Sequence, residues 1–131
     1  MAVIISHALI FDKNGRFLVL CRSKKEKVLP EYWDLPGGTV RLREDPMVAA
    51  IRETKEECGL EIFDLELFTH ISTWDSVKKE KFVTLFFKAE KYSGNIKLNQ
   101  NDHQEYSWVS KNEIRKIRTV KYFKKILNYI N

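Results

Sequence analysis

The sequence is poor in cysteine. Its 131 residues contain only Cys21 and Cys58, and neither belongs to a CxxC pair or to a Cys and His spacing typical of zinc sites. A disulfide framework and a structural zinc site are therefore excluded as organising features. We predict two buried free thiols. Cys58 should be a poor nucleophile, because it lies among glutamates, which raise the pKa of a neighbouring thiol.

Long apolar runs are also missing. The N-terminal apolar run, residues 2–11, is interrupted by His7, lacks a basic leader and is too short to span a bilayer. We therefore expect a soluble, cytoplasmic protein with no membrane partner. A hydrophobic content of 44% in 131 residues suffices for one core. We expect a single domain over residues 1–131, as a monomer or a homodimer.

Basic residues are unevenly distributed. The net charge is +5, but residues 110–131 hold seven Lys or Arg and one Glu, so the rest of the chain carries a net charge of −1. The basic residues alternate with apolar ones as in an amphipathic C-terminal helix, which indicates a solvated helix face. The alternative is a surface that steers polyanions. A small-molecule partner is therefore expected before nucleic acid. If the chain does bind nucleic acid, the basic C-terminal helix is the expected contact surface.

The first part of the chain is rich in β-forming residues. Residues 3–12 and 16–22 are joined by a turn containing Asn14-Gly15, a strong hairpin signal, so we expect them to pair antiparallel. Residues 23–36 are polar and contain two prolines. They are interpreted as a loop that leads to the glycine pair Gly37-Gly38.

Helix signals begin after this loop. Asp45 and Pro46 are typical of an N-cap and a first helical residue, and Gly59 is a typical stop, so a helix is predicted over residues 46–58. Runs of β-forming residues predict strands at residues 62–74, 81–89 and 107–109. Capping residues predict helices that start after Ser110 and at Thr119. This order of elements favours a mixed sheet covered by helices.

Three glutamates of the predicted helix lie on one face. Glu53 stands three and four residues before Glu56 and Glu57, and such residues are neighbours on a helix. Like charges at this spacing repel unless a cation neutralises them. Carboxylate oxygens suit Mg²⁺, with Mn²⁺ as a substitute, and Mg²⁺ is usually shared with substrate phosphates. A divalent metal site is therefore predicted, with a merely solvated acidic face as the alternative.

The segment from Gly38 to Leu60 resembles the signature of the Nudix hydrolases. Thr54 is the one departure, since the family usually has an aliphatic residue there, and it leaves the acidic residues intact. The flanking residues 33–38 and 105–109 are also similar to family segments. The resemblance implies an α/β/α sandwich with a central mixed sheet flanked by helices. The matching positions are Gly38, Glu44, Arg52, Glu53, Glu56, Glu57, Gly59 and Leu60.

The resemblance also implies a role for each matching side chain. Glu44 would be an outer-shell partner of the metal. Arg52 would orient a neighbouring glutamate through an ion pair, a task for which a guanidinium fork is well suited. The metal ligands would be the backbone carbonyl of Gly38 and the carboxylates of Glu53, Glu56 and Glu57.

The general base and the substrate contacts are less closely defined. The base would be Glu53 or Glu56 of the signature, or Glu105 outside it. Arg22, at the end of a predicted strand, is a candidate contact for a substrate phosphate, and Gly37 is a second candidate substrate contact.

The activity implied by the resemblance is Mg²⁺-dependent cleavage of a nucleoside diphosphate linked to another moiety. All three prolines precede Leu60, so the downstream proline of many ADP-ribose hydrolases is absent. The tyrosine of diadenosine polyphosphate hydrolases and the element of NADH hydrolases are also absent. Elimination favours a MutT-type nucleoside triphosphate pyrophosphatase. The alternatives are an ADP-ribose, nucleotide-sugar or dinucleotide pyrophosphatase, and a non-catalytic regulator that binds nucleotides or RNA.

Overall fold

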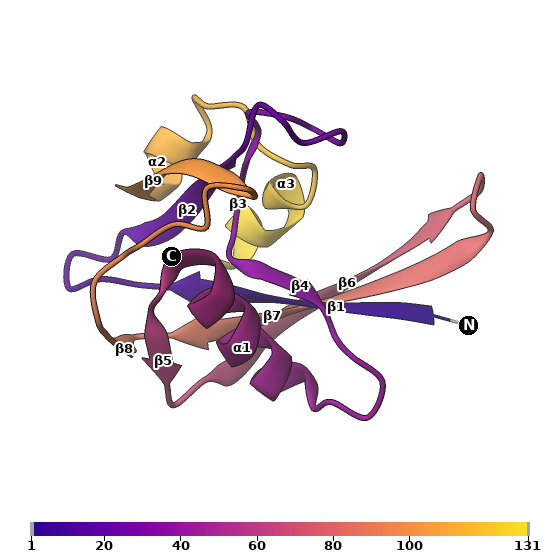
Figure 1. The fold of residues 1–131 in the computed structure, drawn as a ribbon, viewed down its shortest axis with the longest axis horizontal. Coiled ribbons are helices and arrows are strands. Elements are labelled where there is room, and N and C mark those ends of the chain that lie inside the picture. The colour runs from indigo at the N-terminus through magenta and orange to yellow at the C-terminus, as the bar shows by residue number, and fades with distance from the viewer. Residues whose placement is uncertain (1, 131) are drawn as a thin grey trace.

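The computed structural model describes residues 2–130 (Figure 1). Within that range, no helix combines the length and the apolar character needed to cross a membrane. In chain order the elements are β1 (Ala2–Ile10), β2 (Phe17–Arg22), β3 (Trp33–Asp34), β4 (Gly37–Thr39), α1 (Pro46–Cys58), β5 (Glu61–Phe63), β6 (Glu66–Asp75), β7 (Glu80–Ala89), β8 (Lys91–Ser93), β9 (His103–Val109), α2 (Lys111–Ile114), α3 (Phe123–Ile126) and the 3-10 helix η1 (Leu127–Tyr129).

The strands form three sheets. The largest has the order β4-β1-β7-β6 and is mixed, because β1 runs parallel to β7 while the other neighbours are antiparallel. A second sheet has the order β3-β2-β9, and β5 pairs with β8. Helix α1 lies on one side of the mixed sheet, and the second sheet with α2 and α3 lies on the other (Figure 1). This arrangement confirms the predicted α/β fold class.

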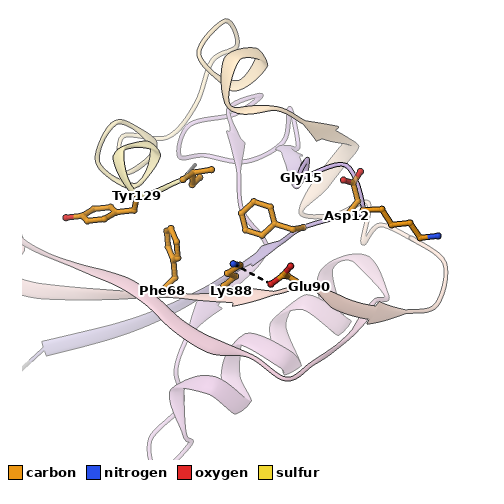
Figure 2. A pocket seen from close by; sticks show the side chains of 9 residues that line it. Asp12, Gly15, Phe68, Lys88, Glu90 and Tyr129 are labelled. Carbon is orange, nitrogen blue, oxygen red and sulfur yellow. Dashed lines mark ion pairs between the residues drawn. The ribbon is translucent and has the colours of Figure 1, made fainter.

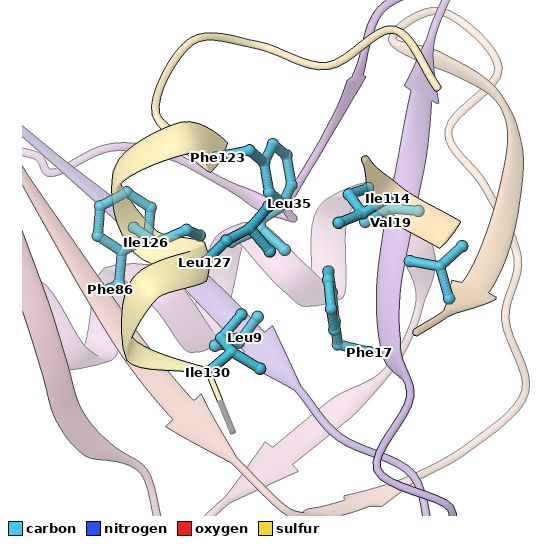
Figure 3. Packing of buried hydrophobic residues seen from close by; sticks show 11 residues of the cluster. Leu9, Phe17, Val19, Leu35, Phe86, Ile114, Phe123, Ile126, Leu127 and Ile130 are labelled. Atoms are coloured by element: carbon cyan, nitrogen blue, oxygen red, sulfur yellow. The ribbon is translucent and has the colours of Figure 1, made fainter. Parts of the chain in front are cut away.

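Strand β1 separates two hydrophobic cores because its side chains alternate between the two faces of the sheet. Leu9 faces a core that packs α3 and η1 onto the strands, whereas Ala8 and Ile10 face a core beneath α1. Figure 3 shows the first core, which consists of Leu9, Phe17, Val19, Leu35, Phe86, Val109, Ile114, Phe123, Ile126, Leu127 and Ile130.

Helix α1 has the bounds that its caps predict. The Asp45 carboxylate accepts a hydrogen bond from the Met47 N–H at 2.8 Å, and Gly59 ends the helix with a φ of 81°. Ala50 and Thr54 are fully buried, on a helix that packs against β1 and β4. The helix is thus anchored by small side chains, and its acidic residues lie beside the start of β4.

The predicted hairpin between the first two strands is wrong. The turn does form: the Asp12 carboxylate accepts from the Asn14 N–H at 2.9 Å, and Gly15 has a φ of 75°. An isolated antiparallel bridge then joins Phe11 to Phe17, and the strands separate into different sheets. Both edges of β1 are taken by β4 and β7, and both edges of β2 by β3 and β9. Local composition indicates a strand but does not select its partner.

Three other predicted elements differ in extent. The strand expected over residues 62–74 is divided into β5 and β6, with Asp64 between them at a φ of 52°. The predicted loop contains β3, and the last strand starts at His103, before the predicted residue 107. These short or irregular strands depend on pairing with distant segments, which sequence periodicity does not reveal.

The basic C-terminal segment is not the continuous helix that its pattern suggests. Ser110 caps α2 as predicted, accepting from the Glu113 N–H at 3.2 Å, but α2 ends at Ile114. Thr119 does not start a helix. It forms a parallel bridge with Trp33, whose N–H donates to the Arg118 carbonyl at 2.8 Å. Backbone groups used in this pairing are not free for helical hydrogen bonds.

Candidate metal centre

Arg52 organises the acidic face of α1. Its Nε and Nη2 donate to the two carboxylate oxygens of Glu44 at 2.7 and 3.0 Å. Its Nη1 donates to Glu53 at 2.9 Å and to Glu56 at 3.2 Å. Hydrogen bonds from Arg52 are the main reason that the pKa of Glu44 falls to about 2. The guanidinium thus forms the ion pair expected from the sequence, and it contacts three of the four signature glutamates.

Glu57 is held differently. Its side chain is 14% exposed, and Oε1 accepts from the Gly37 N–H at 2.7 Å. Burial raises the pKa of Glu57 to about 9, and the negative charges of Asp34, Glu53 and Asp102 add to the shift. A buried carboxylate among other carboxylates is the environment that a bound cation would stabilise.

The glycine pair is packed tightly against its neighbours. A Cβ atom on Gly38 would lie 2.5 Å from Cδ of Glu53, and one on Gly37 would lie 2.2 Å from the backbone oxygen of Ser6. A side chain at position 37 would therefore meet the backbone of β1, whereas one at position 38 would displace the Glu53 carboxylate. The Gly38 backbone is thus brought directly to Glu53.

The three signature glutamates of α1 differ in exposure. The side chains of Glu53 and Glu57 are 18% and 14% exposed, whereas that of Glu56 is 50% exposed. Arg52 holds Glu53 and Glu56, and Gly37 holds Glu57. Accordingly, within residues 2–130 no three His, Cys, Asp or Glu side chains converge as the ligands of one metal ion.

The donor set nevertheless suits a hard divalent cation. Mg²⁺ and Mn²⁺ prefer hard oxygen donors. Burial, with the negative charges of Asp34 and Glu53, raises the pKa of Glu57 to about 9, and a bound cation would offset this cost of ionising the carboxylate. Glu53 and Glu57 lie one turn apart beside the Gly38 backbone. The residues therefore fit such an ion, provided that Glu53 and Glu56 turn from Arg52 toward Glu57.

Two predicted site residues form no hydrogen bond or ion pair with the described glutamates of α1. Arg22 donates through Nε to the Val28 carbonyl at 3.1 Å and through Nη1 to Asp34 at 3.4 Å. Glu105 is exposed on β9, opposite Cys21. It lines a surface hollow together with Gln104 and other residues of the segments 96–100 and 104–106. The charges that act most strongly on Glu57 do not include Glu105.

The structure brings three further polar residues to the site that sequence reasoning did not select. Asp34, Asp102 and His103 come from β3, the turn before β9 and the start of β9. Asp34 and His103 are 7% and 3% exposed. The available sequence signal for Asp34 was its position in the segment that leads to the glycine pair. The contact of His103 with this segment has no sequence signal, because almost 70 residues separate the two.

A separate hollow lies between the first turn and the C-terminus, away from the glutamates of α1 (Figure 2). Lys88 and Glu90 form an ion pair across 3.4 Å in this hollow, and Lys88 also lies 5.6 Å from the centre of the Phe11 ring. Lys88 and Glu90 therefore already have partners. The lining residues are Phe11, Asp12, Lys13, Gly15, Phe68, Lys88, Glu90, Tyr129 and Ile130.

Both thiols are buried and free. Burial, with a smaller contribution from Glu57, raises the pKa of Cys58 to about 11. Burial likewise raises the pKa of Cys21, with Glu105 contributing in the same direction. Neither environment favours a thiolate, as expected from the sequence.

Comparison with known proteins assigns the family. The family model described as the NUDIX domain matches residues 2–129. The structure of a MutT protein from Methanosarcina mazei is similar, with a TM-score of 0.81 and 28% identity, over 98% of this chain and 90% of that one. An 8-oxo-dGTP diphosphatase of Buchnera aphidicola is 25% identical over 107 residues, which are 82% of this chain and 76% of that protein.

With other relatives the match covers a smaller part of each protein. An m7GpppN-mRNA hydrolase of Xenopus laevis, NUDT17, is 34% identical over 68 residues, which are 52% of this chain and 23% of that protein. The chain spans 36% and 32% of two further curated relatives. The family model, by contrast, covers residues 2–129 of this chain. The chain therefore belongs to the Nudix family.

Proposed function

We propose that this chain is a Mg²⁺-dependent pyrophosphohydrolase that converts a nucleoside triphosphate or deoxynucleoside triphosphate to the monophosphate and pyrophosphate. The observation that carries the proposal is the pair of half-buried carboxylates, Glu53 and Glu57, beside the Gly37-Gly38 backbone. Such a cluster holds negative charge that a cation shared with a polyphosphate would neutralise. We assign the activity to one Nudix domain over residues 1–131.

The proposed metal ligands are the Gly38 carbonyl and the carboxylates of Glu53, Glu56 and Glu57. When bound, Mg²⁺ would neutralise the phosphate oxygens and make water a better nucleophile. Arg52 would hold Glu53 and Glu56 in place until they turn toward the ion, and Glu44 would fix the guanidinium from behind.

Proton abstraction is assigned to one of three carboxylates. Glu53 and Glu56 belong to the acidic face itself, and Glu105 is the candidate outside the signature. A base must come within hydrogen-bond reach of the attacking water. Glu53 and Glu56 lie on the face proposed to hold the metal, where Arg52 contacts both.

Arg22 and Gly37 are proposed at the substrate end of the site. Arg22 is anchored by Asp34, Glu26 and the Val28 carbonyl, so it would present a fixed positive charge to a phosphate. The Gly37 N–H donates to Glu57, and a substrate oxygen would compete for this donor once Glu57 turns to a cation.

The choice of substrate is supported by relatives of similar length. The Buchnera relative is an 8-oxo-dGTP diphosphatase. A nucleoside triphosphatase of Escherichia coli, NudI, is 26% identical over 118 residues and 80% of each chain. Both act on triphosphates, which agrees with the absence of the sequence marks of other subfamilies.

A product-resolved substrate screen tests the proposal. The purified protein would be incubated with nucleoside triphosphates, oxidised triphosphates, ADP-ribose, dinucleoside polyphosphates and capped RNA, with Mg²⁺, Mn²⁺ or EDTA. We expect monophosphate and pyrophosphate from a triphosphate, and no product in EDTA. Faster cleavage of ADP-ribose or a dinucleotide would contradict the proposed substrate class.

The screen also separates an enzyme from a binding module. A module would cleave none of these substrates and would bind RNA in a salt-sensitive manner. That binding would be lost when the basic residues of the C-terminal segment are neutralised. The residues to change are Lys121, Lys124 and Lys125.

Gly38→Ala should weaken metal binding more than it weakens the fold. The new Cβ would displace the Glu53 carboxylate, whose other neighbour, Arg52, holds it at 2.9 Å. We expect Mn²⁺ affinity, measured by electron paramagnetic resonance, to fall about 10- to 100-fold. Gly15→Ala is the control for a glycine substitution outside the site: nothing lies within 4 Å of its Cβ position, and the strain at its φ of 75° would act on the fold rather than on Mn²⁺ affinity. Unchanged Mn²⁺ affinity in Gly38→Ala would contradict the proposed site.

A further inference from the structure

His103 is buried at the start of β9 with its polar atoms unpaired. His103 is 3% exposed, and neither Nδ1 nor Nε2 of its ring has a hydrogen-bond partner among the described residues. Leaving a buried polar group unpaired costs about 1–3 kcal/mol. A histidine at this position is therefore not explained by packing alone.

Each ring nitrogen of His103 faces a different carboxylate. Nδ1 lies 3.9 Å from Oε2 of Glu57, and Nε2 lies 3.6 Å from Oδ1 of Asp34. The opposite oxygens are already engaged: Gly37 donates to Oε1 of Glu57 at 2.7 Å, and Arg22 donates to Oδ2 of Asp34 at 3.4 Å. The remaining oxygen of each carboxylate is thus directed at the imidazole, slightly beyond hydrogen-bond distance.

The backbone also ties His103 to Glu57. The Asn99 N–H donates to the Glu57 carbonyl at 2.9 Å, and the Asn99 carbonyl accepts from the His103 N–H at 3.0 Å. The same turn is fixed to β2, because the Ser23 N–H donates to the Asp102 carbonyl at 2.9 Å. The His103 side chain therefore follows a turn whose backbone is hydrogen-bonded to the C-terminal end of α1 and to the residue after β2.

We propose that His103 is a positioning residue that orients the Glu57 carboxylate for a divalent cation, with Asp34 fixing the imidazole from its other side. Outer groups that hydrogen-bond to a ligand select its rotamer and strengthen binding. Nδ1 would donate to Oε2 of Glu57 once the 3.9 Å between the two atoms shortens, so that the ring sets the orientation of the carboxylate. This inference rests on the proposed metal site, and His103 itself contacts neither cation nor substrate.

Two amide substitutions separate the two ring nitrogens. The amide nitrogen of asparagine is as many bonds from Cβ as Nδ1 is, whereas that of glutamine corresponds to Nε2. His103→Asn therefore keeps a donor toward Glu57 and loses the one toward Asp34. His103→Gln does the reverse, and His103→Phe removes both donors while keeping a ring.

The experiment measures Mn²⁺ affinity by electron paramagnetic resonance and, separately, thermal unfolding in EDTA. We expect His103→Phe and His103→Gln to weaken Mn²⁺ binding about 10- to 100-fold, and His103→Asn to stay within about threefold of the unchanged protein. The two amide variants should unfold at similar temperatures in EDTA. His70→Asn is the control, because His70 is exposed on β6, and it should change neither quantity.

The outcomes are separable. Equal weakening by His103→Asn and His103→Gln would overturn the proposal, since the ring would then act through packing. Unchanged Mn²⁺ affinity in His103→Phe would also overturn it, and if this variant does not fold, the two amide variants still decide. Glu57→Gln serves as the reference. If that variant binds Mn²⁺ normally, the proposed metal site itself fails, independently of His103.

Discussion

Glu57→Gln should reduce Mg²⁺-dependent nucleotide hydrolysis about a thousandfold in kcat/KM, equal to about 4 kcal/mol of transition-state stabilisation. The substitution removes a charged oxygen donor from the proposed site and keeps the side chain's shape. Its amide oxygen still accepts from the Gly37 N–H, which now donates to Oε1 at 2.7 Å. The fold should therefore survive while the chemistry is lost.

The same substitution should stabilise the metal-free protein by about 1–3 kcal/mol, because a buried carboxylate beside Asp34 and Glu53 is replaced by a neutral amide. Urea unfolding in EDTA measures this gain. Glu61→Gln is the matched control: Glu61 pairs with Lys55 at 2.8 Å, with both side chains largely exposed. It should alter neither stability nor turnover appreciably. Normal turnover in Glu57→Gln and in Glu56→Gln would contradict the metal site.

Arg52→Gln should lower both stability and activity. The guanidinium makes two hydrogen bonds to Glu44 and one to Glu53, with Arg52 and Glu44 side chains only 18% and 12% exposed. Removing one partner of such a half-buried cluster leaves carboxylates without compensation and should cost about 2–3 kcal/mol. We expect kcat/KM to fall about 100-fold, because Glu53 loses its orientation.

Arg52→Lys should not restore the activity. One ammonium group cannot reproduce the two parallel bonds to Glu44 while also reaching Glu53. Arg41→Gln is the control, since Arg41 is 66% exposed and lies 3.9 Å from Glu56. Stability would be measured by urea unfolding and activity by pyrophosphate release. A fully active Arg52→Lys variant would show that charge alone, without the fork geometry, is sufficient.

The elements that the sequence predicted well are those defined by local chemistry. Asp45 and Gly59 bound α1 because a side-chain cap and a left-handed residue act within one turn of the helix. The turn at Gly15 also forms. The strands on either side of that turn nevertheless pair with β4, β7, β3 and β9. Those partners come from distant parts of the chain, which local signals do not specify.

The C-terminal segment shows the same limit. Its alternating pattern is compatible with a helix, but residues 118–120 use their backbone groups to pair with Trp33. Tyr122, at the N-cap position of α3, makes no capping hydrogen bond through its side chain. Its hydroxyl accepts from the Leu35 N–H at 2.7 Å instead. The segment therefore supports the loop that leads to the glycine pair, a contact between residues far apart in the chain.

By itself, the sequence determined the acidic face of α1, its caps and the family signature, because spacing along a helix is set by covalent geometry. Only the tertiary structure decided which carboxylates are buried, that Arg52 contacts Glu44, and that His103 lies between Asp34 and Glu57. Those contacts arise when separate strands exclude water from a shared interior, and their energies depend on distances that no local pattern specifies.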